Sequence, residues 1–344
     1  MKSKLIFIGP VGVGHQPTSG GTMKNSLFLQ RFSSLFEKIV VVDTEKWRKN
    51  PFVALKLVSV LAFIRKAKVV ISCEAMAPKV VKFLYYFRLQ RDVIYWVIGC
   101  DVVRRISEGE LDVRLFEYLT SIVVQSPKMV ADLNAVGLNN AIYVPNSKPI
   151  YEIQLVARSS KKTKFVFVSR IIPEKGCDFI INCVKRLNAE GYKEQFSISF
   201  YGKIGPDYHF EETIAGIENV AFKGVLNLLE KSGYDELSEY DVFLFPTYYK
   251  GEGFPGSVID AYIAGLPIIA SDWHFNKEVI REGETGFMIS PKDEDALHDR
   301  MLSLIKDKTD LTRMSQNCLK EAKRYDVNAV LSDEVLTKVG LLDK

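Results

Sequence analysis

Short apolar runs alternate with longer amphipathic segments along this chain. The runs are rich in Val, Ile and Phe, as buried parallel strands are. The segments between them have apolar residues at helical spacing. The predicted strands are Leu5–Ile8, Lys38–Asp43, Val69–Ser72, Val93–Ile98, Ile122–Gln125, Lys164–Ser169, Gln195–Gly202, Asp241–Pro246 and Pro267–Ser271. The predicted helices include Lys24–Phe36, Pro51–Ile64, Pro78–Gln90, Pro127–Gly137, Asp293–Ile305 and Val327–Leu341. Strands that alternate with helices predict an α/β fold.

A polar and charged stretch over residues 148–162 divides this pattern into two halves. We interpret it as a linker, because the apolar pattern starts again at Lys164. The chain has 344 residues, which is enough for two domains. The sequence therefore predicts two α/β domains in succession.

The composition is ordinary for a globular enzyme, with 47% hydrophobic and 26% charged residues. The five cysteines are scattered and form no CxxC pair, which favours a reducing, cytoplasmic environment over a disulfide framework. The N-terminal apolar run is too short for a signal peptide, and no stretch is long enough for a transmembrane helix.

The net charge of +4 is unevenly distributed. Residues 1–150 contain 21 Lys and Arg against 11 Asp and Glu, whereas the remainder contains 25 against 31. A basic first half indicates an anionic partner, such as a membrane surface. No motif for nucleic-acid binding accompanies it. The basic helix predicted at Pro78–Gln90 either lies on an anionic bilayer at the inner face of the cell membrane or packs its apolar side on a sheet.

One stretch, Tyr248–Asp272, contains the most informative chemistry. Its pattern predicts a glycine-rich loop after a buried strand, then a helix and another strand. Glu252 lies in the loop and Asp260 lies about one turn into the helix. The N–H groups at the helix start suit a phosphate. A carboxylate, with two acceptor oxygens, suits neighbouring hydroxyls. The combination predicts a nucleotide-sugar site.

The segment EGFPGSVIDAYIAGLPIIASD resembles the E-x7-E signature of the retaining GT-B glycosyltransferases of family GT4. Asp260 replaces the usual second Glu, so its side chain is one methylene shorter. The resemblance implies that Glu252 holds the transferred sugar and that Asp260 holds the ribose. It also implies donor contacts from the loop, the helix start and the base-contacting backbone, namely Gly253, Phe254, Pro255, Gly256, Ser257 and Leu226. Pro255 has no N–H to donate.

A second motif, Arg170 to Gly176 (RIIPEKG), follows a predicted strand. It resembles the family's "gR…eKG" motif, which holds the donor diphosphate. Arg170 and Lys175 would stabilise the charge that grows on the leaving phosphate. A surface ion pair with Glu174 is the plain structural alternative.

The first half offers weaker candidates. The loop at residues 9–22 is rich in glycine, and Gly20-Gly21 resembles the glycine pair that lies against the donor in GT4 enzymes. His15 and Asp101 are the candidate residues on the acceptor side. A solvent-exposed loop histidine is an equal alternative for His15. In the second half, His274 either lines the ligand site or has a packing role.

The acidic run Asp293–Asp295 imitates a D-x-D metal motif but opens a predicted helix, where acids offset the helix dipole. We expect no metal and no cofactor. The substrate would be a UDP- or GDP-sugar donor, and the acceptor a glycan or a lipid-linked sugar, as in surface polysaccharide synthesis.

The resemblance implies a GT-B fold with two Rossmann-like domains facing a central cleft. Its boundaries would be an N-terminal domain at 1–147, a C-terminal nucleotide-sugar domain at 162–325, and a helix at 326–344 that packs back on the first domain. Three alternatives stay open: a non-catalytic nucleotide-sugar-binding partner subunit, a GT-B-fold sugar-nucleotide epimerase and a GT-B-fold phosphorylase.

Overall fold

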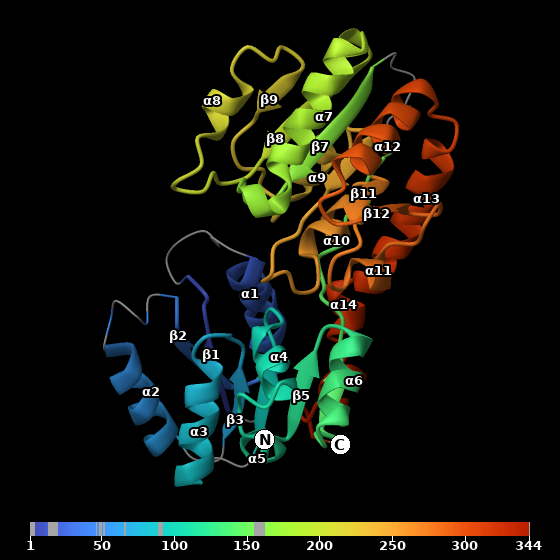
Figure 1. The fold of residues 1–344 in the computed structure, drawn as a ribbon. Helices are drawn as coiled ribbons and strands as arrows, with labels where there is room; N and C mark the ends of the chain where they lie inside the picture. Colours follow the sequence, from blue (N-terminus) through green and yellow to red (C-terminus); the bar gives the residue numbers. More distant parts are fainter. Residues whose placement is uncertain are drawn as a thin grey trace. The chain divides into compact units, whose positions relative to one another are not determined.

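The computed structural model describes residues 4–12, 20–45, 47, 50, 52–64, 67–88, 92–154 and 162–343. The chain forms two compact units (Figure 1). Unit 1 comprises Met1–Lys148 and Val327–Lys344, and unit 2 comprises Pro149–Asp326. The change of unit falls between Lys148 and Pro149, at the start of the stretch that the sequence indicated as a linker. Within the described residues, no helix is both long and apolar enough to cross a membrane.

Unit 1 is built on a six-stranded sheet of order β2-β1-β3-β4-β5-β6, in which all neighbouring strands are parallel. Three central strands are completely buried, as expected when helices cover both faces of a parallel sheet. The elements are β1 (Lys4–Gly9), α1 (Gly20–Ser33), β2 (Lys38–Asp43), α2 (Phe52–Phe63), β3 (Ala67–Ile71), α3 (Ala77–Phe87), β4 (Val93–Trp96), α4 (Asp101–Ser107), α5 (Val113–Glu117), β5 (Ser121–Val124), α6 (Pro127–Ala135), β6 (Ala141–Tyr143), α14 (Val327–Val330) and α15 (Asp333–Lys338).

Unit 2 repeats this architecture with a parallel sheet of order β12-β11-β10-β7-β8-β9. Its elements are β7 (Thr163–Val168), η1 (Pro173–Lys175), α7 (Cys177–Ala189), η2 (Lys193–Gln195), β8 (Phe196–Tyr201), α8 (Phe210–Ile214), β9 (Val220–Phe222), α9 (Lys231–Leu237), β10 (Val242–Phe245), α10 (Gly256–Ile263), β11 (Ile268–Ser271), α11 (Asn276–Val279), β12 (Gly286–Ile289), α12 (Glu294–Lys306), α13 (Leu311–Ala322) and η3 (Lys323–Tyr325). The predicted α/β class is confirmed: each unit is a Rossmann-like domain.

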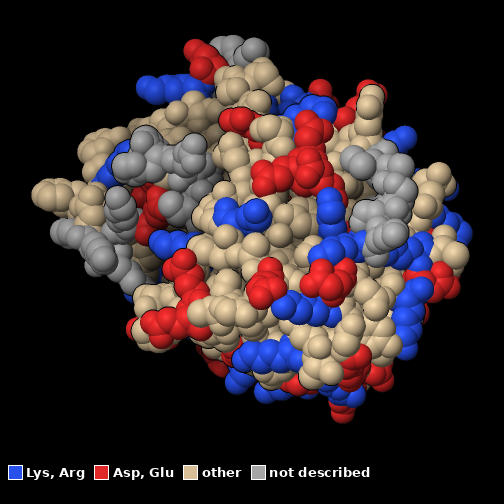
Figure 2. Space-filling model, turned by 90° about the horizontal axis from the view of Figure 1, so that it is seen from above, with Lys and Arg blue, Asp and Glu red and all other residues tan. Residues whose placement is uncertain are grey.

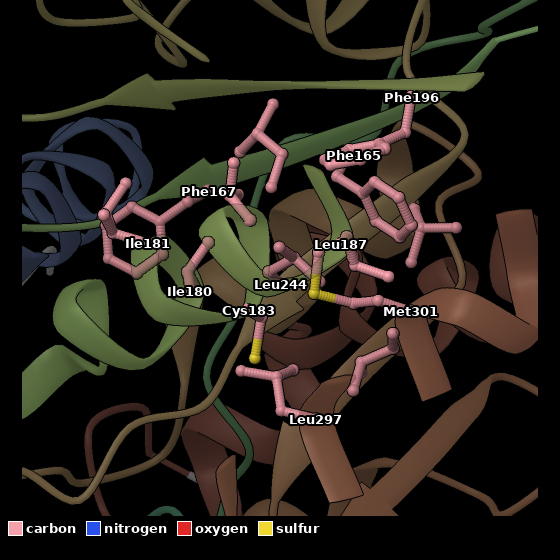
Figure 3. Packing of buried hydrophobic residues seen from close by; sticks show 14 of the residues in the cluster. Phe165, Phe167, Ile180, Ile181, Cys183, Leu187, Phe196, Leu244, Leu297 and Met301 are labelled. Atoms are coloured by element: carbon pink, nitrogen blue, oxygen red, sulfur yellow. The ribbon is translucent and has the colours of Figure 1, made fainter. Parts of the chain in front are cut away.

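An aromatic and aliphatic core fixes the sheet of unit 2 against its helices. Phe165 and Phe167 of β7 pack against Leu187 of α7 and Met301 of α12 within one buried cluster (Figure 3). Phe167 and Phe200, on neighbouring strands, have ring centroids 5.4 Å apart. This core holds the carboxyl ends of β7 and β10 in place, and the motif residues follow those strand ends.

The C-terminal segment completes the core of unit 1. Five buried apolar side chains of this segment join a cluster that includes Phe28 and Phe32 of α1; they are Val330, Leu331, Leu336, Val339 and Leu341. Lys68 Nζ donates to Gly340 O at 3.1 Å and pairs with Asp343 at 2.7 Å.

The structure corrects three local expectations. Helix α1 begins at Gly20, so Gly20 and Gly21 open the helix and are not part of the preceding loop. Two short helices replace the predicted helix Val327–Leu341, because Ser332 begins a new helix with its hydroxyl accepting from Val335 N. Asp101 starts α4, which the apolar pattern did not predict.

The predicted role of the acidic run at a helix start is confirmed. Asp293 is the N-cap of α12, and its carboxylate accepts from Ala296 N at 2.9 Å.

On the face drawn in Figure 2, basic and acidic side chains are interspersed.

Candidate functional site

The predicted carboxylate motif follows β10, a central strand of unit 2 that lies between β7 and β11. A loop over residues 246–255 leads from β10 to α10. Pro255 is the N-cap of α10 and makes no side-chain hydrogen bond to the helix start. No cap side chain therefore competes with an anion for the N–H groups of the first turn.

Lys175 and Glu252 form a buried ion pair that joins the two sequence motifs. Lys175 ends η1, just beyond β7, and Glu252 lies in the loop after the adjacent strand β10. Lys175 Nζ contacts Glu252 Oε2, and the two side chains are 6% and 13% exposed. Thr247 Oγ1 donates to the same carboxylate oxygen at 3.0 Å. A cation suited to a phosphate and an acid suited to hydroxyls thus lie in direct contact.

Arg170 lies against the same part of the loop. Its guanidinium carbon is 4.8 Å from the centroid of the Tyr249 ring, and Lys175 Nζ is 5.3 Å from that centroid. Arg170 is exposed at the surface, whereas Lys175 is buried. The Tyr249 ring therefore attracts both of the cations that are predicted to hold the diphosphate. Tyr249 was not among the predicted site residues; it precedes the glycines of the loop and matches no motif by itself.

Hydrogen bonds to backbone carbonyl groups hold this loop in position. Tyr248 N donates to Glu174 O at 2.8 Å, which ties the carboxylate loop to the turn that contains Lys175. Trp273 Nε1 and Glu252 N both donate to Tyr249 O, at 2.8 and 3.0 Å. Because these bonds link three consecutive strand ends, the geometry of Glu252 depends on the sheet as well as on its own loop.

Asp260 is buried, at 5% exposure, in the second turn of α10. Its Oδ1 accepts a 2.6 Å hydrogen bond from the hydroxyl of Tyr234 in α9. Burial, assisted by the nearby Asp260 carboxylate, raises the pKa of Tyr234 well above its usual value, so its hydroxyl stays a donor. Leu226, the predicted base contact, lies after β9 and packs on the same buried cluster as Tyr234. No sequence signal pointed to Tyr234, which stands in an ordinary amphipathic segment.

The charge of the Glu252 carboxylate interacts electrostatically with His274. Partial burial lowers the pKa of His274, while the Glu252 carboxylate opposes that shift. Its backbone has a φ of 48°, in the left-handed region that non-glycine residues seldom adopt. The lowered pKa favours the neutral form of the imidazole.

The candidates of the first half lie in unit 1, each in a different setting. Gly20 and Gly21 start α1, and Gly20 is exposed with no atom within 4 Å of a built Cβ. Asp101 pairs with Arg104 at 2.9 Å on the surface of α4. His15 falls outside the described residues. The functional roles of these four residues stay predictions.

Glu74 is a site candidate that sequence reasoning missed. It follows β3, and burial raises the pKa of its carboxyl group while the Asp101 N–H, donating at 3.1 Å, opposes that rise. It lines a cavity of about 280 Å³ together with Thr44 and Trp47. Its position three residues after a buried strand was the available signal, since ligand sites of such sheets collect at strand carboxyl ends.

The described residues contain no group of three or more His, Cys, Asp or Glu side chains arranged to hold a metal ion.

Comparison with known proteins gives this site a context. Residues 162–307 match the family described as Glycosyl transferases group 1. A Klebsiella pneumoniae protein, "Uncharacterized 41.2 kDa protein in cps region", is 26% identical over 77% of this chain and 72% of its own length. The Staphylococcus aureus "Capsular polysaccharide biosynthesis glycosyltransferase CapM" is 24% identical over 49% of this chain and 43% of its own length. This chain therefore spans less than half of CapM.

The fold also matches that of solved structures. The crystal structure of Anabaena HepE in complex with UDP superposes with a TM-score of 0.72 at 14% identity, over 98% of this chain and 100% of HepE. The two parallel-sheet units and this superposition show that the chain has the GT-B fold. The match to the Glycosyl transferases group 1 family covers residues 162–307, which is less than half of the chain.

Proposed function

We propose that this chain is a retaining, metal-independent GT4-type glycosyltransferase. It moves a sugar from a UDP- or GDP-sugar to a glycan or lipid-linked acceptor in surface polysaccharide synthesis. Support for the acceptor comes from the two relatives, one from a cps region and one named for capsular polysaccharide biosynthesis. Support for a uridine nucleotide comes from HepE, which was solved with UDP.

The single observation that carries the proposal is the convergence of Arg170, Lys175 and Glu252 around Tyr249. Breaking the donor's glycosidic bond places negative charge on the β-phosphate oxygen. A planar guanidinium and a point-charge ammonium, held in advance at that oxygen, lower the barrier because they need no reorganisation. The buried setting strengthens this effect, because little water screens Lys175.

Glu252 takes the complementary role. In the proposed complex the diphosphate takes over part of the hydrogen-bonding capacity of Lys175, which has three donors. The Glu252 carboxylate then accepts from hydroxyls of the transferred sugar, and the N–H groups of Gly253, Gly256 and Ser257 assist at the helix start. Phe254 and Pro255 shape the loop backbone.

Asp260 is the proposed ribose contact, and Leu226 contacts the base through its backbone. A carboxylate oxygen accepts more than one hydrogen bond, so the bond from Tyr234 is compatible with this role. We infer retention through front-face attack, steered by the departing phosphate, because no carboxylate in this site is assigned as a nucleophile.

The test compares Lys175→Ala and Glu252→Gln with the unchanged chain in a transfer assay with UDP- and GDP-sugars and a lipid-linked acceptor. Either substitution should reduce kcat by about 100-fold or more, the usual effect of removing one preorganised charge contact. Lys193→Ala is the matched control, since Lys193 forms an exposed pair with Glu218 elsewhere in unit 2. Circular dichroism should show that all variants are folded.

Several outcomes would contradict the proposal. Near-normal transfer by Lys175→Ala or Glu252→Gln would remove the assigned roles. An inverted anomeric centre in the product, seen by NMR, would exclude retention, and loss of activity with EDTA would exclude metal independence. A product formed from the donor alone would indicate an epimerase. A protein that binds the donor but neither transfers the sugar nor hydrolyses the donor would be a non-catalytic subunit.

A further inference from the structure

Exposed apolar side chains are concentrated on two consecutive helices of unit 1. Eight large apolar residues are exposed in the part of the chain that the structure describes, and six of them lie on α2 or α3. Phe63 and Phe52 are the most exposed of the six, at 85% and 71%. We call the following residues the α2–α3 surface: Phe52, Leu55, Val58, Phe63, Tyr86 and Phe87. Clustered apolar exposure of this kind marks an interaction site.

Both helices lie on one face of their sheet. The chain moves in the same direction along the sheet from β2 to β3 and from β3 to β4, and right-handed crossovers place such connections on the same side. Figure 1 draws α2 and α3 as neighbours there. Helix α2 buries only Leu57 and Leu61. Helix α3 buries Val80, Val81 and Leu84 and so directs Tyr86 and Phe87 to the solvent.

Positive charge accompanies this apolar surface. Residues 46–92 contain eleven Lys and Arg but only two Asp and Glu, so most of the basic excess of residues 1–150 lies in this segment. Neither α2 nor α3 contains an acidic residue. Lys56, Lys82 and Arg88 are exposed on or beside the two helices.

We propose that the α2–α3 surface docks the protein on an anionic lipid bilayer. Phenylalanine and leucine side chains would enter the boundary between headgroups and acyl chains, while the lysine and arginine side chains reach the headgroup phosphates. Tyr86 suits the interface because its ring is apolar and its hydroxyl is polar. Two signals acting together, apolar insertion and charge attraction, produce stable peripheral binding. This proposal does not depend on the transfer reaction.

The charge pattern favours a bilayer over a second copy of the chain. In a two-fold dimer through this surface, the basic residues of both copies would be brought together without an acid from either helix to offset them. A bilayer containing anionic lipids supplies a continuous negative surface for the same residues.

Vesicle co-sedimentation tests the proposal with the full chain. The vesicles are phosphatidylcholine alone, or phosphatidylcholine mixed with an equal amount of phosphatidylglycerol. The unchanged protein should sediment with the anionic vesicles and much less with the neutral ones. The triple variant Phe52→Ser, Leu55→Ser, Phe63→Ser should bind at least about tenfold more weakly, because each large apolar side chain contributes to insertion. The double variant Lys56→Gln, Lys82→Gln should bind the anionic vesicles about fivefold more weakly for each charge removed.

Tyr143→Ser is the matched control, because Tyr143 is an exposed aromatic residue of unit 1 outside this surface; it should bind vesicles as the unchanged protein does. The substituted residues are exposed, so melting temperatures should stay unchanged. Anionic vesicles that fail to bind the unchanged protein, or that bind the serine variant equally well, would overturn the proposal. A dimer in sedimentation velocity that the serine variant dissociates would also overturn it, in favour of self-association.

Discussion

At the scale of single residues, the site combines exposed and buried charges with different energetic consequences. The buried pair of Lys175 and Glu252 loses much of its hydration, and each charge depends on the other for compensation. Arg170 keeps contact with solvent and is held by the Tyr249 ring. A diphosphate would therefore meet one exposed cation and one buried cation.

The Tyr234 hydroxyl should be needed to position Asp260 for the ribose. Tyr234→Phe removes the 2.6 Å hydrogen bond while keeping the ring. We expect UDP to bind more weakly and 2′-deoxy-UDP to be affected less, so the preference of the protein for UDP over the deoxy nucleotide should shrink. Isothermal titration calorimetry with both nucleotides measures this preference.

Tyr262→Phe is the control for that experiment. Tyr262 is also fully buried, and its hydroxyl donates to Val279 O at 2.9 Å. Removing the Tyr262 hydroxyl should lower the free energy of unfolding by about 1 kcal/mol. The preference of the protein for UDP over the deoxy nucleotide should stay intact. If the unchanged protein shows no preference for UDP, the ribose role of Asp260 fails; if Tyr234→Phe retains the full preference, only the role of Tyr234 fails.

Lys24 should make the stability of the protein depend on alkaline pH. It is buried in α1, its Nζ is 3.4 Å from Val97 O, and burial lowers its pKa to about 7. Between pH 7 and the unfolded pKa near 10.5, the unfolded chain binds the proton and the folded chain does not, so this group makes stability rise with pH. Lys24→Met should remove that rise and stabilise the protein most at pH 7 and below, because each tenfold loss of proton affinity on folding costs about 1.4 kcal/mol.

Melting temperatures of both proteins at pH 6, 7, 8, 9 and 10 check this expectation, because the difference between them cancels every other titrating group. A constant difference across this range would contradict a lowered pKa for Lys24.

At the scale of secondary-structure elements, the sequence predicted most strands of both sheets to within two residues. Buried parallel strands are short, apolar and β-branched on both faces, so their signal is local. It did not predict the short helices α4 and α5, and it also left out the longer helices α7 and α13. α4 and α5 contain fewer residues than a periodic pattern needs.

Gly176 should tolerate no side chain, because it connects the Lys175 turn to α7 at a close approach to another strand end. Its φ is 82°, and a Cβ there would be 2.4 Å from Pro246 O. Gly191, beyond the other end of α7, has a φ of 90° with nothing within 4 Å. Gly191→Ala should cost about 1–2 kcal/mol from its left-handed backbone alone. Gly176→Ala should cost about 1–3 kcal/mol more through the clash.

Urea denaturation of both variants measures these costs, and the transfer assay measures a second effect. Displacing Pro246 should disturb the Glu252 loop, so Gly176→Ala should also reduce transfer, while Gly191→Ala should leave it unchanged. Equal stability losses in the two variants would contradict the close approach at Gly176.

At the scale of the whole molecule, the last residues of the chain belong to the unit that its first residues build. Arg31 of α1 donates to Leu331 O at 3.1 Å, and Ser121 Oγ of β5 donates to Val339 O at 2.7 Å. Apolar contacts with Phe28 and Phe32 accompany these bonds. Unit 1 is thus closed by a segment that lies at the opposite end of the sequence from α1.

Deleting residues 327–344 should unfold unit 1. The deletion removes five buried apolar side chains, each worth about 1.5–3 kcal/mol, so the loss is comparable with the whole stability of a typical domain, about 5–15 kcal/mol. Hydrogen exchange should show lost protection in β1, β4 and β5, with protection retained in unit 2.

Asp343→Ala is the control for the deletion. Asp343 is 85% exposed where it pairs with Lys68, so its loss should cost less than about 1 kcal/mol. A deleted chain that keeps full protection in unit 1 would show that the C-terminal segment is not part of its core.

The sequence by itself determined the α/β class, most of the strands, and the motif residues Arg170, Lys175, Glu252 and Asp260. These features are local: strand composition, glycines and charged residues at fixed spacing are visible in short windows. Only the tertiary structure decided that Lys175 contacts Glu252, that the Tyr249 ring lies beside Arg170 and Lys175, that Tyr234 donates to the buried Asp260, and that α2 exposes its phenylalanines. These features depend on which strands are neighbours in the sheet and on which helix faces are packed against other elements. Both are determined by contacts between residues that are far apart in the chain.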